Sequence, residues 1–245
     1  MGWLEHTGQV SIEISTKCDM SHLHAECPLN HIPASMMPSD TVLKILAELG
    51  ANEYTGNIAF SRYGEPGTDP RLWSFIAMAK SRVPRAGITI TTNGRFLSPS
   101  IIMELEELGV VKIHVSLYGN TLQQRKIKEV LDGIAERLTT MQLEAPLPVN
   151  GHAHKPLIDI YTREEREEPY VPCYQPLADI SIDVLGHVTL CCLDWKSRNC
   201  LGTISNDSLE SVIDSSVVRT AFEQLSNGTR LRGICQRCGS SREQR

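Results

Sequence analysis

Residues 9–27 read QVSIEISTKCDMSHLHAEC, and this stretch decides the fold. Its first part, Gln9–Ser15, is rich in Val and Ile and predicts a β-strand. Directly after the strand come Cys18, His22 and Cys27, with His24 inside the same loop. Thiol and imidazole are strong metal ligands, so the sequence predicts a metal centre in the loop that follows the first strand.

The alternation of strand and helix continues to about residue 149. Further strands are expected at Asn57–Arg62, Gly87–Thr91 and Val111–Leu117, and a fifth at Leu143–Val149. Helices are expected to begin at Ser39 or Asp40, at Asp69-Pro70 and at Ser98-Pro99, and another to run from Leu122 to Leu138. Strands alternating with helices predict an α/β fold with a parallel sheet. Four clear units are too few for a closed barrel, which favours an open partial (β/α) barrel.

The last third of the chain has a different character. A proline-rich stretch leads into an expected β-hairpin, Ala178–Val184 with Val188–Cys192, and two short helices, Ser208–Ile213 and Val217–Leu225. We therefore expect two parts: a partial barrel over residues 1–150, and a connection with a small α+β module over residues 151–245.

Composition excludes several classes of protein. The 245 residues contain 24 Lys and Arg against 29 Asp and Glu, a net charge of -5, which gives no reason to expect nucleic acid or an anionic membrane as partner. No apolar run reaches the ~18 residues of a membrane span, and the first ten residues do not resemble a secretory signal. We expect a cytoplasmic protein, whose eight cysteines in a reducing compartment favour metal binding over disulfides.

Polar and glycine-rich motifs follow each of the next three strands. They are Tyr63-Gly64-Glu65-Pro66, Thr92-Asn93-Gly94, and Ser116 with Tyr118 two residues later. Ligands of parallel α/β folds bind where the carboxyl ends of the strands meet. Together with the cysteine loop, these motifs predict one site that combines a metal centre with a polar ligand.

This order of motifs resembles the radical S-adenosylmethionine (SAM) superfamily. Its members hold a [4Fe-4S] cluster on a Cys-x3-Cys-x2-Cys loop after the first strand, and SAM chelates the open iron. By this resemblance Tyr63 to Pro66 matches the family's Gly-Gly-Glu-Pro motif, and Glu65 contacts the SAM amino group. Thr92 and Asn93 match its Thr-Asn-Gly motif, and Ser116 takes the place of a residue near the SAM ribose or carboxylate.

The first loop departs from the family pattern, because it reads Cys18-x3-His22-x4-Cys27. Imidazole replaces thiolate on iron in Rieske centres, where it raises the reduction potential. We expect Cys18 and Cys27 to hold the cluster with either His22 or His24, and His22 occupies the family's second-ligand position. The alternatives are a third ligand from elsewhere, or a scaffold that has lost its cluster.

The C-terminal cysteines resemble the SPASM extension of radical SAM enzymes, or its shorter twitch form. The resemblance implies an auxiliary [4Fe-4S] cluster on Cys173, Cys191, Cys235 and Cys238. We expect Cys192 and Cys200 to be bystanders, although either could substitute as a ligand. Four thiolates on their own also suit tetrahedral zinc.

The resemblance implies an oxidoreductase with SAM and two [4Fe-4S] clusters as cofactors. It also implies a flavodoxin or ferredoxin as electron donor and a small polar substrate, such as a sugar or aminocyclitol. We expect no additional N-terminal peptide-binding domain, which favours this substrate class over peptides. Tyr118, His152 and Lys155 are candidate substrate-contacting residues, since such groups transfer protons. The alternatives are a peptide-modifying enzyme and a metal-binding module without radical activity.

Overall fold

The structure is a computed structural model of the whole chain. It describes residues 3–23, 27–118, 121–145, 161, 164–165, 172–231 and 233–238. The candidate site residues His24, His152 and Lys155 lie outside the described residues.

One open, mostly parallel sheet organises the described part of the chain, with the strand order β5-β4-β3-β2-β1-β6-β7-β8. The parallel strands of the first part are β1 (Gln9–Ile12), β2 (Asn57–Phe60), β3 (Gly87–Thr92), β4 (Val110–Val115) and β5 (Gln142–Glu144). All of them begin within about two residues of the positions expected from the sequence. The expected α/β fold with an open partial barrel is confirmed.

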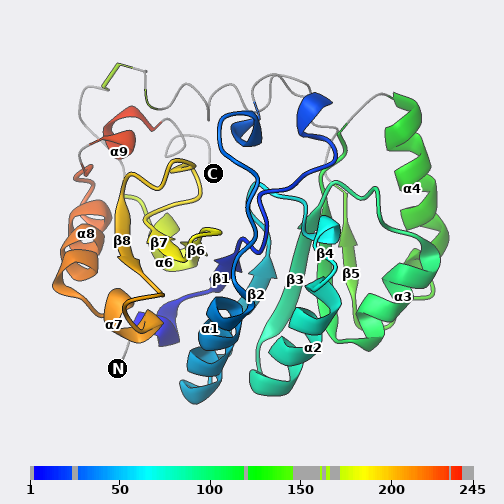
Figure 1. The fold of residues 1–245 in the computed structure, drawn as a ribbon, viewed down its shortest axis with the longest axis horizontal. Coiled ribbons are helices and arrows are strands. Elements are labelled where there is room, and N and C mark those ends of the chain that lie inside the picture. The colour runs from blue at the N-terminus through cyan, green and yellow to red at the C-terminus, as the bar shows by residue number, and fades with distance from the viewer. Residues whose placement is uncertain are drawn as a thin grey trace.

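Helices follow the strands as the apolar periodicity predicts. They are α1 (Ser39–Ala51), α2 (Leu72–Arg82), α3 (Pro99–Glu107) and α4 (Thr121–Ala135). In Figure 1, α1 and α2 lie in front of the strands, and the loop that follows β1 lies at the top of the molecule. Each of α1, α2 and α3 buries a stripe of Leu, Ile or Val against the sheet.

Of the helix caps expected from the sequence, that of α3 is confirmed and that of α1 is wrong. Ser98 caps α3 as expected, because its Oγ accepts a hydrogen bond from the Ile101 amide at 3.3 Å. The cap expected from Ser39 or Asp40 is wrong. Helix α1 already begins at Ser39 after Pro38, without a side-chain cap, and the Ser39 Oγ instead accepts a hydrogen bond from Arg71 at 3.0 Å.

The C-terminal part extends the same sheet. Strand β6 (Asp179–Ile182) pairs in parallel with β1, and β7 (His187–Thr189) and β8 (Cys200–Thr203) follow antiparallel. The β6–β7 pair is the expected hairpin, whereas β8 has no signal in the sequence. Short helices complete this part: α6 (Gln175–Ala178), α7 (Leu209–Ile213), α8 (Ser216–Ser226) and α9 (Ile234–Arg237).

A large apolar core is shared by both parts of the sheet. Val10 and Ile12 of β1 share it with Ile182 of β6 and with Leu209 of α7. A smaller cluster of Leu190, Ala221 and Leu225 lies beneath the cysteine-rich end. None of the helices in the described part of the chain combines the length and apolar character that a membrane span requires.

Candidate radical SAM and auxiliary cluster sites

The loops after β1 and β2 pack tightly against each other. The Glu65 amide donates a hydrogen bond to the Lys17 carbonyl at 2.8 Å, and Thr68 Oγ1 donates to the same carbonyl at 3.3 Å. At Gly64 an added Cβ would lie 1.7 Å from the Ser15 carbonyl oxygen, so only glycine fits this approach. The 63–66 motif is thereby fixed directly beside the cysteine loop.

The Glu65 side chain is buried and accepts three hydrogen bonds. Oε1 accepts from Thr92 Oγ1 at 2.8 Å and from the Gly67 amide at 3.0 Å, and Oε2 accepts from the Asn93 amide at 2.7 Å. Burial raises the pKa of this carboxyl to about 7, although the three donors oppose the rise. The 63–66 motif and the Thr92-Asn93-Gly94 motif thus meet at one carboxylate.

Asn93 joins this carboxylate to the cysteine loop. Its Nδ2 donates to Asp19 Oδ1 at 2.8 Å and lies 3.9 Å from the sulfur of Cys18. Arg95 adds an ion pair to Asp19 at 3.3 Å. Asp19 and Arg95 carried no signal in the sequence, because an Asp and an Arg in loops are ordinary surface residues.

Cys18, Cys27 and Tyr118 share one electrostatic environment. Burial raises the pKa of both thiols, and the charges of Glu65 and Cys27 add to the rise at Cys18. Burial also raises the pKa of Tyr118, with contributions from both cysteines, while a hydrogen bond with Ser116 opposes it. These residues therefore lie near one another, and their roles at the site stay predictions.

His22 is placed differently from the two cysteines. It lies in the short 3-10 helix Ser21–Leu23 and is exposed. Its role as a ligand stays a prediction, as does that of His24, which lies outside the described residues.

The second group of cysteines surrounds a cavity. Cys173, Cys191, Cys235 and Cys238 all line it, and its volume of about 130 Å³ is several times the room a water needs. Burial and the neighbouring thiols Cys238 and Cys173 raise the pKa of Cys235 to about 12, and the charge of Arg230 opposes this. Within the described ranges no three His, Cys, Asp or Glu side chains gather around one point as a single metal ion would require. Four thiols that line one cavity could hold an iron-sulfur cluster or a tetrahedral zinc ion.

The two alternative ligands differ in position. Cys192 also lines the cavity, and its thiol is hydrogen-bonded to that of Cys191, which raises the pKa of Cys191 and lowers that of Cys192. Cys200 is exposed, and its thiol donates to the Gly202 carbonyl at 3.1 Å. Cys192 thus stays an alternative, whereas Cys200 is turned to another partner.

An iron count tests the second site. Replacing Cys235 and Cys238 together by serine removes two of the four thiolates, so we expect reconstituted protein to lose about four of its about eight irons. Cys200→Ser is the matched control and should keep all of them. Equal iron in the double variant and the wild type would contradict the assignment.

Comparisons with known proteins agree with this architecture. Residues 173–239 match the SPASM family, described as an iron-sulfur cluster-binding domain. The chain has the fold of radical SAM enzymes with a SPASM-type extension, as its motifs predict. Over 235 residues it is 23% identical to an S-adenosyl-L-methionine-dependent 2-deoxy-scyllo-inosamine dehydrogenase of Niallia circulans, covering 94% of this chain and 92% of the relative.

Solved structures give the same result. BtrN in complex with AdoMet and 2-DOIA superposes with a TM-score of 0.76 at 21% identity, covering 94% of this chain and 92% of that one. Native anSMEcpe with bound AdoMet superposes with a TM-score of 0.59 at 12% identity, covering 97% and 92%. At these identities the likeness concerns the fold.

Proposed function

We propose that this protein is a radical SAM oxidoreductase that acts on a small polar substrate, an aminocyclitol or a sugar. SAM and a reduced cluster, when bound, would supply a 5'-deoxyadenosyl radical that takes a hydrogen atom from a substrate carbon. The observation that carries this proposal is the position of Asn93, which holds the Cys18–Asp19 loop through its side chain and Glu65 through its backbone amide. The proposed cluster ligand Cys18 and the proposed receptor for the SAM amino group, Glu65, are thereby held next to each other.

At the first site, some residues would hold the cluster and others would bind SAM. Cys18 and Cys27, with His22 as third ligand, would hold a cluster whose open iron supplies the electron for SAM cleavage. The carboxylate of Glu65 would receive the SAM amino group. Thr92 and Asn93 keep that carboxylate oriented, because each donates to one of its oxygens.

The second site would accept the electron that oxidation releases. After losing a hydrogen atom, an alcohol carbon must lose one proton and one electron to become a ketone. Cys173, Cys191, Cys235 and Cys238 would hold a fully coordinated [4Fe-4S] cluster as electron acceptor, since four thiolates leave no open iron for substrate. Buried Leu190, Leu225 and Ile234 line the same cavity and keep water away.

Three residues are candidates for contact with the substrate and for proton transfer. Tyr118 is half-buried and lies near Cys18 and Cys27, and we propose that it contacts a substrate beside SAM. We also propose His152 and Lys155 for this task. A dehydrogenase reaction is supported by the relative from Niallia circulans, whose name gives 2-deoxy-scyllo-inosamine as its substrate.

The proposed reaction needs an electron donor and a reducing compartment. A flavodoxin or ferredoxin would reduce the first cluster, and the cytoplasm would keep the thiols available. All eight cysteines are free in the structure, as this setting requires.

Reductive cleavage of SAM tests the function. Anaerobically reconstituted protein with a strong reductant should convert SAM into 5'-deoxyadenosine and methionine, measured by chromatography. A protein that carries its full iron and yet forms no 5'-deoxyadenosine, with and without candidate aminocyclitols, would refute radical chemistry and leave a metal-binding scaffold.

The third cluster ligand can be tested in the same assay. His22→Ala should lose about four irons and at least about tenfold in 5'-deoxyadenosine formation, because two cysteines alone cannot hold the cluster. His22→Cys restores a thiolate at this position, so it should keep its iron and show a more negative reduction potential. His6→Ala, another exposed histidine, is the control. Unchanged iron in His22→Ala would assign the third ligand elsewhere.

A further inference from the structure

Arg62 is a buried cation between the two proposed cofactor sites. Its side chain is only 2% exposed, although it directly precedes the 63–66 motif. One terminal nitrogen lies 3.6 Å from Glu13 and 4.0 Å from Asp183, and the other donates to the Asp194 carbonyl at 3.1 Å. These partners follow β1, β6 and β7, so a single guanidinium ties both parts of the chain together.

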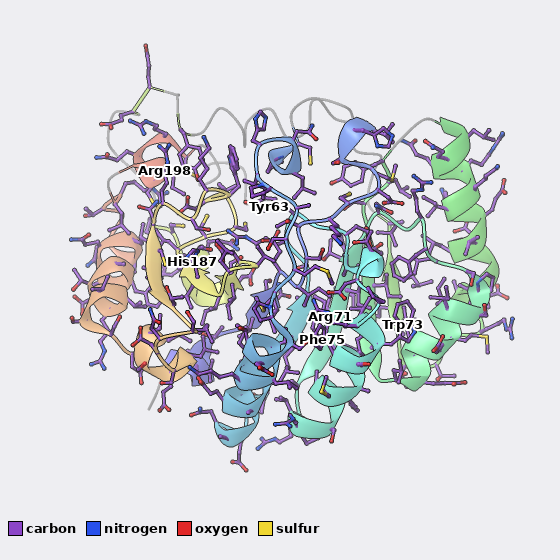
Figure 2. The ribbon with its side chains drawn as sticks, viewed as in Figure 1. Tyr63, Arg71, Trp73, Phe75, His187 and Arg198 are labelled. Atoms are coloured by element: carbon purple, nitrogen blue, oxygen red, sulfur yellow. The ribbon has the colours of Figure 1, made fainter. Side chains whose placement is uncertain are left out.

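Tyr63 makes the second connection between the same loops. Its hydroxyl donates a hydrogen bond to the carbonyl of Cys192, and its amide donates to Glu13 Oε1 at 3.1 Å. The Arg62 guanidinium lies 5.2 Å from the centre of its ring. Figure 2 shows Tyr63 close below the loops at the top of the molecule, between the two halves.

The loop that these residues contact is itself tightly held. The Asp194 amide donates to the Cys191 carbonyl at 3.1 Å, and the fully buried Asp194 carboxylate accepts from the amides of Arg198 and Asn199 at 3.0 and 2.6 Å. Arg62 has a backbone φ of 149°, a conformation that residues other than glycine rarely adopt. The contacts of Arg62 with its surroundings therefore hold its backbone in this conformation. A movement of residues 191–194 would displace residues 62 and 63 directly, because the two segments are hydrogen-bonded to each other.

We infer that Arg62 and Tyr63 are positioning residues that couple the two cofactor sites. A cluster in the cysteine cavity fixes Cys191 and the loop to Asp194, and the contacts to Tyr63 and Arg62 then fix the loop that presents Glu65 to SAM. By linkage, SAM in turn favours the ordered cysteine loop. This inference rests on the proposed function, because it needs SAM at Glu65 and a cluster at the four cysteines.

A double-mutant cycle on SAM affinity tests the coupling without any turnover. The dissociation constant of SAM is measured by equilibrium dialysis in four proteins with a reconstituted first cluster: the wild type, Tyr63→Phe, and each of them with Cys235→Ser and Cys238→Ser. In the wild-type background, loss of the auxiliary cluster should weaken SAM binding at least about fivefold, the lower end of common coupling energies. In the Tyr63→Phe background the same loss should weaken SAM binding by a clearly smaller factor, because only the Arg62 contact to Asp194 then joins the two loops.

Tyr54→Phe is the matched control, because Tyr54 also donates from its hydroxyl to a backbone carbonyl, that of Asn57, at 3.2 Å. This bond lies at the opposite end of β2 from Tyr63, so the variant loses a comparable hydrogen bond and should keep the full coupling. Equal SAM affinity with and without the auxiliary cluster would overturn the coupling alone. Absence of SAM binding in iron-replete wild type would overturn the proposed function as well.

Discussion

Replacing Gly64 by alanine is expected to abolish SAM binding and to lower 5'-deoxyadenosine formation roughly thousandfold, a loss of about 4 kcal/mol in transition-state stabilisation. The added Cβ would lie 1.7 Å from the oxygen and 2.7 Å from the carbon of the Ser15 carbonyl. Both atoms belong to the backbone, so no side-chain rotation relieves the overlap. The 63–66 loop must move away from the cysteine loop, and Glu65 moves with it. SAM affinity by equilibrium dialysis and product formation measure the effect.

Gly133→Ala provides the matched control in helix α4. Nothing lies within 4 Å of a Cβ added there, and alanine favours a helix interior over glycine by up to about 1 kcal/mol. This variant should bind SAM normally and unfold at an equal or slightly higher temperature. If Gly64→Ala kept SAM affinity within about threefold of the wild type, the loop would not be the SAM-binding loop.

The sequence predicts the first part of the fold well because its signals are local. Ile with Phe marks β2, alternating Ile and Thr mark β3, and the Ser98-Pro99 pair marks the start of α3, which depends only on the next three residues. The resemblance to the SPASM extension singles out Cys173, Cys191, Cys235 and Cys238, and these four residues line one cavity.

The pairing of β6 with β1 has no such local signal. It joins Gln9–Ile12 to Asp179–Ile182, and the hydrogen bond from Ser11 Oγ to Asp179 Oδ1, 2.7 Å long, crosses 168 positions of the chain. Apolar periodicity shows that both segments are strands, but it does not show which strands are neighbours. That the strands of both parts form one sheet is therefore known only from the structure.

The network around Arg62 was missed for the same reason. Glu13 interrupts the apolar strand pattern of residues 9–15, which was the one available sign of a buried charge. Its partner Arg62 lies 49 positions later, and Asp183, the second carboxylate beside the same guanidinium, lies 170 positions after Glu13 by residue number. A buried charge needs a partner, but the sequence does not show which residue supplies it.

The affinity for SAM is expected to fall about thirtyfold between pH 8 and pH 5.5, because the pKa of Glu65 is raised to about 7 by burial. Above pH 7 the side chain is a carboxylate that attracts the SAM amino group, and below pH 7 it is neutral. Each pH unit below this value lowers the affinity by about tenfold. Glu65→Gln should bind SAM weakly at every pH, with a flat profile. Glu104→Gln, an exposed acid on α3, should keep the wild-type profile.

The same carboxyl should affect the stability of the SAM-free protein in the opposite direction. A pKa raised from 4.5 to about 7 means that the folded state binds the proton more tightly than the unfolded state. The free energy of unfolding therefore falls as pH rises from 4.5 to 7, by at most about 3 kcal/mol, and Glu65→Gln removes this decrease. Saturating SAM places its amino group, a cation, beside the Glu65 carboxylate and thereby lowers the pKa of Glu65. The decrease in the free energy of unfolding between pH 4.5 and 7 should then disappear. Denaturant titrations at several pH values, with and without SAM, measure both effects, and a slope unchanged by SAM would separate Glu65 from the SAM site.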